Sequence, residues 1–192
     1  MVFLISEIGV NWDGDFSLLE EMMKKSKEIG FDVVKFQAFL PAMVKEHPEF
    51  SRLVKSSVSS DNIDEIDEAV NLLKSFDIDI SLLQCTTKYP TCAEDVGLNV
   101  ITEMAERYML PVGISDHSGT IFPSLAATSL GADILEFHSV FDRKMFSPDS
   151  SSSLEMNEIA KLVEGVRFIE ESLNNPIYKN NNEKQKDLRK MF

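Results

Sequence analysis

Two histidines of this chain follow apolar segments that are predicted to form neighbouring strands. His117 comes just after the segment 112–115, and His138 comes directly after the segment 133–137. A helix rich in alanine and leucine, predicted over 122–130, joins the two strands and ends at a glycine. Strands joined in this way are parallel, so both histidines are expected at one edge of the sheet. Neutral imidazoles bind divalent transition metals, and the pair therefore predicts a metal site.

A single histidine is more often a hydrogen-bonded structural residue than a ligand, and only the pairing favours metal binding. The chain has one further histidine, His47, beside a proline in a polar stretch, and we interpret it as solvated.

Two other polar residues have both a chemical and a structural interpretation. Lys35 lies in the apolar segment 32–39, where Gln37 shares its face, and a buried ammonium group must be paired. It is expected either to bind a phosphate or carboxylate, or to form an ion pair with Glu7. Asp149 follows the second histidine strand and is expected either to contact the ligand or to cap the next helix.

Apolar periodicity predicts an alternation of strands and helices. Strands are expected over 2–10, 32–39, 78–85, 110–115 and 133–137, and helices over 17–29, 63–76, 94–108, 122–130 and 158–173. The helix over 17–29 is expected to be capped by Ser17. The segment 40–55 has no regular pattern, although 53–59 resembles a weak strand. This order is typical of an α/β protein with a parallel sheet, which binds ligands at the carboxyl ends of its strands.

Composition excludes several classes of function. The 192 residues suit one domain but are fewer than the roughly 250 of a complete eight-fold α/β barrel. A net charge of −13 argues against nucleic acid as a partner. The two cysteines, Cys85 and Cys92, are expected to be reduced, and no apolar run is long enough to cross a membrane. The protein is therefore expected to be cytoplasmic, with the initial apolar residues forming a strand.

A series of motifs occurs in a fixed order along the chain. They are SEIGVNWDGD at 6–15, DVVKFQAF at 32–39, LLQCTTKYPTCAEDVGLN at 82–99, VGISDHSG at 112–119, ILEFHSVFDRKMFSPDSSSSL at 134–154 and LVEGVRFIE at 162–170. In sequence and order they resemble the N-acetylneuraminate (sialic acid) synthase family, which includes the legionaminic and pseudaminic acid synthases. The resemblance implies an eight-stranded (β/α) barrel of the TIM type, followed by a small antifreeze-like domain.

The same resemblance implies a function. Members of the family are transferases of carbohydrate biosynthesis that condense phosphoenolpyruvate with an N-acetylated aldose, such as N-acetylmannosamine, to a nine-carbon 2-keto acid and phosphate. A divalent metal, usually Mn²⁺, polarises the aldehyde. The full-length form is expected to be a homodimer.

The residues that match the family's site fall into three groups. The metal ligands correspond to His117 and His138, and the catalytic residues to Glu7, Lys35 and Asp149. Substrate-binding positions correspond to Gln37, Ser57, Thr87, Tyr89, Ser115 and again Asp149.

The chain also departs from the family. Trp12 replaces a histidine, Thr87 replaces an asparagine or serine, and about two strands with an acidic motif have no counterpart around 40–56. We expect an incomplete barrel of about six strands over 1–174 and a polar linker over 175–192. The alternative is a catalytically inactive remnant that binds a metal, a sugar phosphate or a partner.

Overall fold

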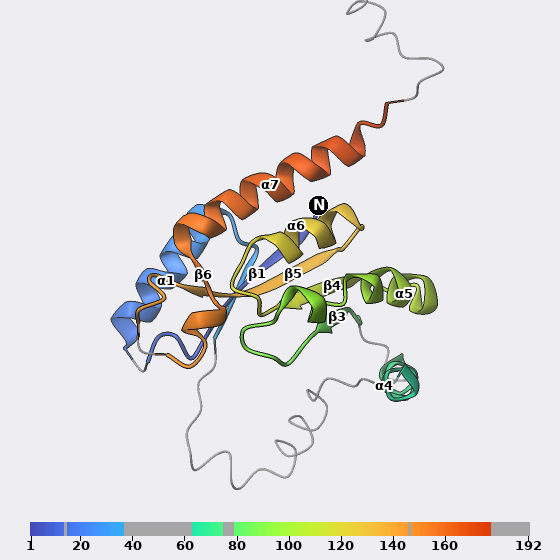
Figure 1. The fold of residues 1–192 in the computed structure, drawn as a ribbon, viewed down its shortest axis with the longest axis horizontal. Helices are drawn as coiled ribbons and strands as arrows, with labels where there is room; N and C mark the ends of the chain where they lie inside the picture. Colours follow the sequence, from blue (N-terminus) through green and yellow to red (C-terminus); the bar gives the residue numbers. More distant parts are fainter. Residues whose placement is uncertain (14, 37–62, 75–78, 146, 178–192) are drawn as a thin grey trace, which may run out of the picture.

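A parallel sheet lies at the centre of the computed structural model, which describes residues 1–13, 15–36, 63–74, 79–145 and 147–177 (Figure 1). Its strands are β1 (Phe3–Gly9), β2 (Val33–Phe36), β3 (Leu82–Cys85), β4 (Val112–Asp116), β5 (Ile134–Val140) and the short β6 (Leu154–Glu155). The order across the sheet is β2-β1-β5-β4-β3, and β6 pairs with the end of β5. All of these pairings are parallel, which confirms the predicted α/β class.

Helices follow the strands in the expected alternation. They are α1 (Phe16–Ile29), α4 (Ile63–Lys74), α5 (Leu98–Tyr108), α6 (Phe122–Ser129) and α7 (Met156–Asn174), with 3-10 turns η1 (Ala93–Asp95) and η2 (Ser150–Ser152). Helix α6 connects β4 to β5, and these two strands are paired as predicted. The histidine-bearing strands are therefore direct neighbours.

The core lies between the sheet and the helices that cover one of its faces. Alternate residues of β1, among them Leu4 and Ile8, are fully buried, as are Leu135 and Phe137 of β5. They pack with apolar residues of α1, α5, α6 and α7 in one continuous cluster. The period of two along each strand turns the intervening residues, such as Glu136, toward the other face.

Several predicted helix ends are wrong for identifiable reasons. Asp15, and not Ser17, caps α1, because its carboxylate accepts hydrogen bonds from the amides of Ser17 and Leu18. The helix predicted over 94–108 is broken at Gly97, whose φ of 69° ends η1 before α5 begins. Helix α7 begins at Met156, two residues before the predicted start.

The start of α7 is fixed by a reciprocal capping box between Glu155 and Glu158, in which each carboxylate accepts from the other residue's backbone amide. Arg143, from the loop after β5, also donates to the Glu158 carboxylate at 2.5 Å. The loop that carries Asp149 is thus tied to the first turn of α7.

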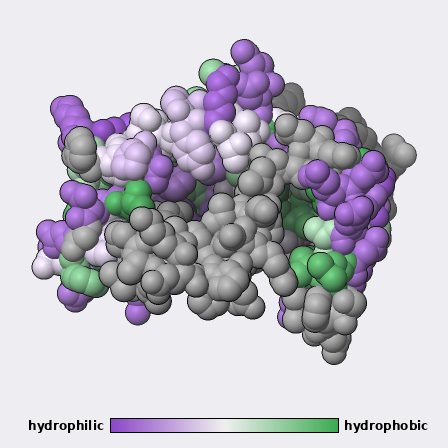
Figure 2. All heavy atoms as spheres, turned by 90° about the horizontal axis from the view of Figure 1, so that it is seen from below, coloured by the Kyte–Doolittle hydropathy of each residue, from purple (hydrophilic) through white to green (hydrophobic). Residues whose placement is uncertain are grey.

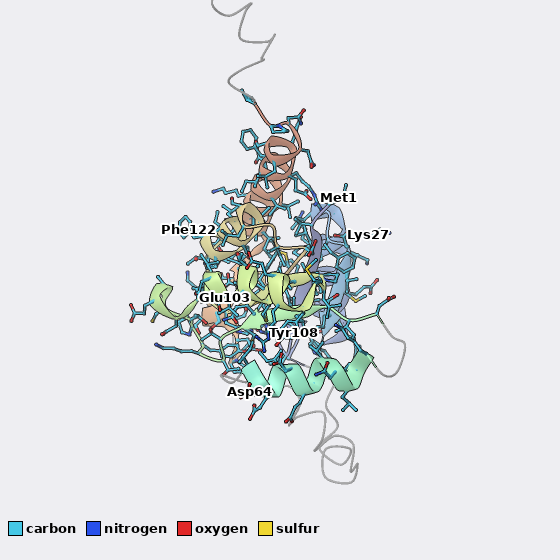
Figure 3. The ribbon with its side chains drawn as sticks, turned by 90° about the vertical axis from the view of Figure 1, so that its right-hand side faces the viewer. Met1, Lys27, Asp64, Glu103, Tyr108 and Phe122 are labelled. Atoms are coloured by element: carbon cyan, nitrogen blue, oxygen red, sulfur yellow. The ribbon has the colours of Figure 1, made fainter. Side chains whose placement is uncertain are left out.

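Helix α4 lies beside α5 (Figure 3). Its Asp67 accepts hydrogen bonds from Arg107 Nε and from Tyr108 Oη, each at 2.8 Å. Most of the other residues of α4 are exposed, and Val70 is its buried residue. Polar contacts from one carboxylate therefore contribute much of the link between α4 and α5 in the described part of the chain.

The face shown in Figure 2 carries hydrophilic side chains toward both ends, with small hydrophobic areas between them. No helix within the described ranges is long and apolar enough to cross a membrane. The predictions for His47, for the weak strand over 53–59, for the gap around 40–56 and for most of the linker fall outside the described residues.

Candidate active site

The carboxyl ends of β1, β2, β4 and β5 gather most of the predicted site residues. Glu7 of β1 lies opposite Lys35 on one side and opposite His138 on the other. Ser115 of β4 lies opposite Glu136 of β5. The register of the parallel strands therefore brings together residues that are far apart in the sequence, and places them at the edge where such sheets bind ligands.

His117 is held at both ring nitrogens. Its Nδ1 lies 3.0 Å from the carbonyl oxygen of Thr86, and its Nε2 lies 2.9 Å from the hydroxyl of Tyr89. Burial, together with the nearby His138, lowers the pKa of His117. The imidazole is therefore neutral at neutral pH, which is the form that can bind a metal.

His138 is buried and lies next to Asp149. Its Nδ1 has no hydrogen-bond partner among the described residues and lies 3.9 Å from Asp149 Oδ2. Burial lowers the pKa of His138. Gly9 lies close beneath the ring, since a Cβ atom there would be 3.2 Å from Nδ1 of His138. Asp149 precedes η2 without capping it through its side chain, so its carboxylate faces the histidine instead.

Four polar side chains form a connected network beside the histidines. Lys35 Nζ lies 2.5 Å from Glu7 Oε2 and 3.2 Å from Glu136 Oε2, while Ser115 Oγ donates to Glu136 at 2.9 Å. The ion pair between Lys35 and Glu7, which was the alternative to anion binding, is thus present. The Lys35 side chain is still 50% exposed, so it also remains accessible to a ligand.

The pKa values of the network follow from burial and charge. Glu7 is only 2% exposed, and burial raises the pKa of its carboxyl despite the opposing effect of Lys35. Burial acts to lower the pKa of Lys35, but its hydrogen bond to Glu7 and the charge of Glu136 outweigh this and raise it. The ammonium group therefore stays charged, while Glu7 holds its proton more readily than an exposed carboxyl does.

The two imidazoles are close enough to share one metal ion. Their ring centroids are 5.3 Å apart. Metal–nitrogen bonds of about 2.1 Å place the centroids of two rings on one ion roughly 4.5–5.3 Å apart. The unpartnered, buried Nδ1 of His138 also fits a ligand role. Within the described ranges, however, no group of three histidine, cysteine, aspartate or glutamate side chains is arranged so that it could hold a metal ion. The pair would supply two ligands of a shell that other groups complete.

The remaining predicted site residues are placed as follows. Tyr89 stacks on His117 at 4.1 Å between centroids, and burial and nearby charges raise its pKa to about 12. Thr87 lies in the exposed part of the same loop. Gln37 and Ser57 fall outside the described residues.

Asp116 and Glu136, the acidic residues within two positions of the histidines in the sequence, do not hydrogen-bond to the imidazole rings. Asp116 bonds instead to Ser118, and Glu136 bonds to Lys35 and Ser115.

Sequence reasoning also did not identify the role of Asn11. Its side-chain amide donates to the carbonyl of Ser139 and to Ser153 Oγ, and its oxygen accepts from Ser147. It thereby ties the loop after β1 to the loop that carries Asp149. An Asn in a turn after a strand gives no signal for such a remote partner.

A separate cavity of about 350 Å³ lies between the starts of α5 and α6. Its lining is mainly apolar, with Val96, Leu98 and Phe122 among its residues, and it includes neither histidine. The convergence of ionisable groups, and not this cavity, therefore defines the candidate active site.

Comparison with known proteins identifies a family and several relatives. Residues 42–178 match the sequence model of the NeuB family. N,N'-diacetyllegionaminic acid synthase from Campylobacter jejuni is 34% identical over 148 residues, which cover 76% of this chain but 44% of that enzyme. The protein MJ1065 from Methanocaldococcus jannaschii is 27% identical over 241 residues, with 89% of this chain and 72% of that protein covered.

Among solved structures, N-acetylneuraminic acid (sialic acid) synthetase from Leptospira borgpetersenii, in complex with citrate, superposes with a TM-score of 0.81. That match covers 98% of this chain and 90% of the other chain at 24% identity, which establishes a shared fold.

Proposed function

The chain belongs to the NeuB family, and from this premise we propose that it is the (β/α) part of a sialic-acid-type synthase. The proposed reaction joins phosphoenolpyruvate to an N-acetylated aldose. The π electrons of phosphoenolpyruvate form a bond from C3 to the aldehyde carbon, and the aldehyde oxygen takes up a proton. Water adds at C2 and loses a proton. The resulting C2 hydroxyl then gives up its own proton to the departing phosphate, and the 2-keto acid and inorganic phosphate remain.

The observation that carries the proposal is the convergence of two neutral imidazoles, an ammonium group and three carboxylates at one sheet edge. The distances His117–His138, Lys35–Glu7 and His138–Asp149 place these groups side by side. A structural core has no use for so many ionisable groups, since each must be desolvated. A polar reaction with charged substrates would use all of them.

The charges of this cluster favour a bound cation. The cluster has three carboxyl groups, those of Glu7, Glu136 and Asp149, and one ammonium group, that of Lys35. Phosphoenolpyruvate would add further negative charge, because it is itself an anion. A divalent metal on His117 and His138 would offset this excess of negative charge and, when bound, would polarise the aldehyde of the sugar. Mn²⁺ is the ion we propose.

The protein's own residues have separate tasks in this proposal. Lys35, half exposed between two carboxylates, offers its ammonium group to the phosphate or carboxylate of phosphoenolpyruvate. Glu7, whose pKa is raised by burial, is suited to exchange a proton during water addition. Asp149, 3.9 Å from Nδ1 of His138, would lie beside a metal bound to the histidines and is assigned the proton exchange with the aldehyde oxygen.

The first test measures metal content. Purified wild-type protein is dialysed against Mn²⁺ and then against buffer, alongside His138→Ala and the control His47→Ala, which removes the third histidine of the chain. We expect one bound ion in the wild type and in the control, and little in His138→Ala. Equal metal in all three proteins would refute the site. Phosphate release from phosphoenolpyruvate with N-acetylmannosamine or diacetamido sugars then tests the reaction.

A second candidate, an inactive member of the family that still binds ligands, is favoured by one observation. The alignment with the M. jannaschii protein runs over 241 residues, more than the 192 of this chain, so that relative has residues that this chain lacks. Metal and phosphoenolpyruvate binding without phosphate release would support this second candidate.

A further inference from the structure

The tautomer of His117 follows from its partners. The carbonyl oxygen of Thr86 can only accept a hydrogen bond, so Nδ1 of His117, 3.0 Å away, carries the proton. In the neutral imidazole the lone pair is then on Nε2. The hydroxyl of Tyr89, 2.9 Å away, must donate to that lone pair. Nε2 is also the nitrogen through which His117 would bind a metal, because its other nitrogen is committed to the backbone.

Tyr89 also shields the histidine from solvent. The two rings stack at 4.1 Å with an interplanar angle of 31°. His117 is 4% exposed, whereas Tyr89 is 46% exposed. The Tyr89 ring is also near His138, at 6.0 Å between centroids. A half-exposed side chain therefore covers both histidines, and its outer side is open to solvent.

We propose that Tyr89 is a positioning residue that competes with the metal for Nε2 of His117. In the metal-free protein its hydroxyl holds the ring in the orientation that the metal needs, while the Thr86 carbonyl sets the tautomer. The metal binds only after the hydroxyl has moved off this nitrogen. This inference rests on the metal site of the proposed function, and it assigns Tyr89 a role toward the metal.

The proposal predicts the direction in which metal affinity changes. Tyr89→Phe keeps the stacked ring but removes the hydrogen bond that the metal must break. Mn²⁺ should then bind more tightly, by about 2- to 12-fold, which corresponds to the net loss of one neutral hydrogen bond. If Tyr89 instead helped to hold the metal, the same substitution would weaken binding.

The experiment is a calorimetric Mn²⁺ titration of four proteins. They are the wild type, Tyr89→Phe, His117→Ala and the control Tyr108→Phe, whose hydroxyl bonds to Asp67 on α4. We expect tighter binding in Tyr89→Phe, wild-type binding in Tyr108→Phe and a large loss in His117→Ala. Unchanged or weaker binding in Tyr89→Phe, with His117→Ala still defective, would overturn the inference alone. No binding in any of the proteins would overturn the metal site and the inference together.

A metal-free measurement tests the hydrogen bond itself. Nitrogen NMR of the histidine rings should show the proton of His117 on Nδ1 in the wild type. In Tyr89→Phe the Nε2 resonance should shift while the tautomer stays the same, because the Thr86 carbonyl is still present. A proton on Nε2 in the wild type, or no shift of Nε2 in the variant, would contradict the proposal whatever the metal titrations show.

Discussion

Replacing Gly113 with alanine should separate the two strands that carry the histidines. Gly113 of β4 pairs with Ile134 of β5. A Cβ atom at Gly113 would lie only 2.0 Å from the carbonyl oxygen of Ile134 and 2.7 Å from its carbonyl carbon. The obstacle is backbone within a paired strand and not the end of a flexible side chain, so no rotamer change can relieve it.

The expected cost follows from that distance. The carbonyl oxygen would have to retreat by about 1 Å to reach even the 3.0 Å that real Cβ atoms essentially never go below. Overpacking a core typically costs about 1–3 kcal/mol, and a clash with paired backbone belongs at or above the upper end. About 3 kcal/mol corresponds to a decrease of roughly 6–12 °C in the melting temperature of a chain of this size.

The assay is urea and thermal unfolding of the wild type, Gly113→Ala and the control Gly165→Ala. At Gly165 the nearest atom to a new Cβ is Cδ2 of Leu125 at 2.7 Å, the end of a flexible side chain. In helix α7 the gain in helix propensity, about 1 kcal/mol, offsets that repacking. Gly165→Ala should therefore be near neutral. Equal stability of Gly113→Ala and the wild type would refute the close approach of β4 and β5.

Three further predictions concern charge and completeness. Lys35→Met should weaken phosphoenolpyruvate binding more than sugar binding in calorimetry, and it should raise the pKa of buried Glu7 further. Because a raised folded-state pKa favours the protonated carboxyl, the variant should lose more stability at pH 7 than at pH 5, and equal losses would contradict this. Asp67, whose pKa is lowered to about 2 by Arg107, should stabilise the fold above its unfolded pKa of about 3.9. The stability difference between the wild type and Asp67→Asn should thus close as the pH falls toward 2, and a constant difference would refute the pairing. Finally, the 192-residue chain should release phosphate more slowly than about 1 s⁻¹, because about two of the family's strands are expected to have no counterpart around 40–56, and faster turnover would show them dispensable.

The sheet edge could be predicted from the sequence because it depends on local patterns. Apolar segments of the right length, separated by a helix, are enough to place His117 and His138 at the carboxyl ends of adjacent parallel strands. The capping of α1 was less predictable, since Asp15 and Ser17 are both good caps and only the geometry selects one of them. Strand β6, with the two residues Leu154–Glu155, is too short for any periodicity to indicate.

The partners of the histidines could not be predicted, because they come from remote loops. The groups that hold His117, the Thr86 carbonyl and the Tyr89 hydroxyl, are separated from it by 31 and 28 residues. A backbone carbonyl has no sequence signature, and the acidic neighbours of the histidines were the more obvious acceptors. Their carboxylates are instead used by Ser118 and Lys35.

Strand β5 supplies the interior and the reactive edge from alternate residues of a single segment. Leu135 and Phe137 are buried against the helices, while Glu136 and His138 contribute to the site. Inserting or deleting one residue within Ile134–Val140 would therefore exchange the two sets. It would turn Glu136 and His138 toward the apolar core and two large apolar side chains toward the site. A redesign of this site should keep the length of β5 fixed and vary the loop that follows it.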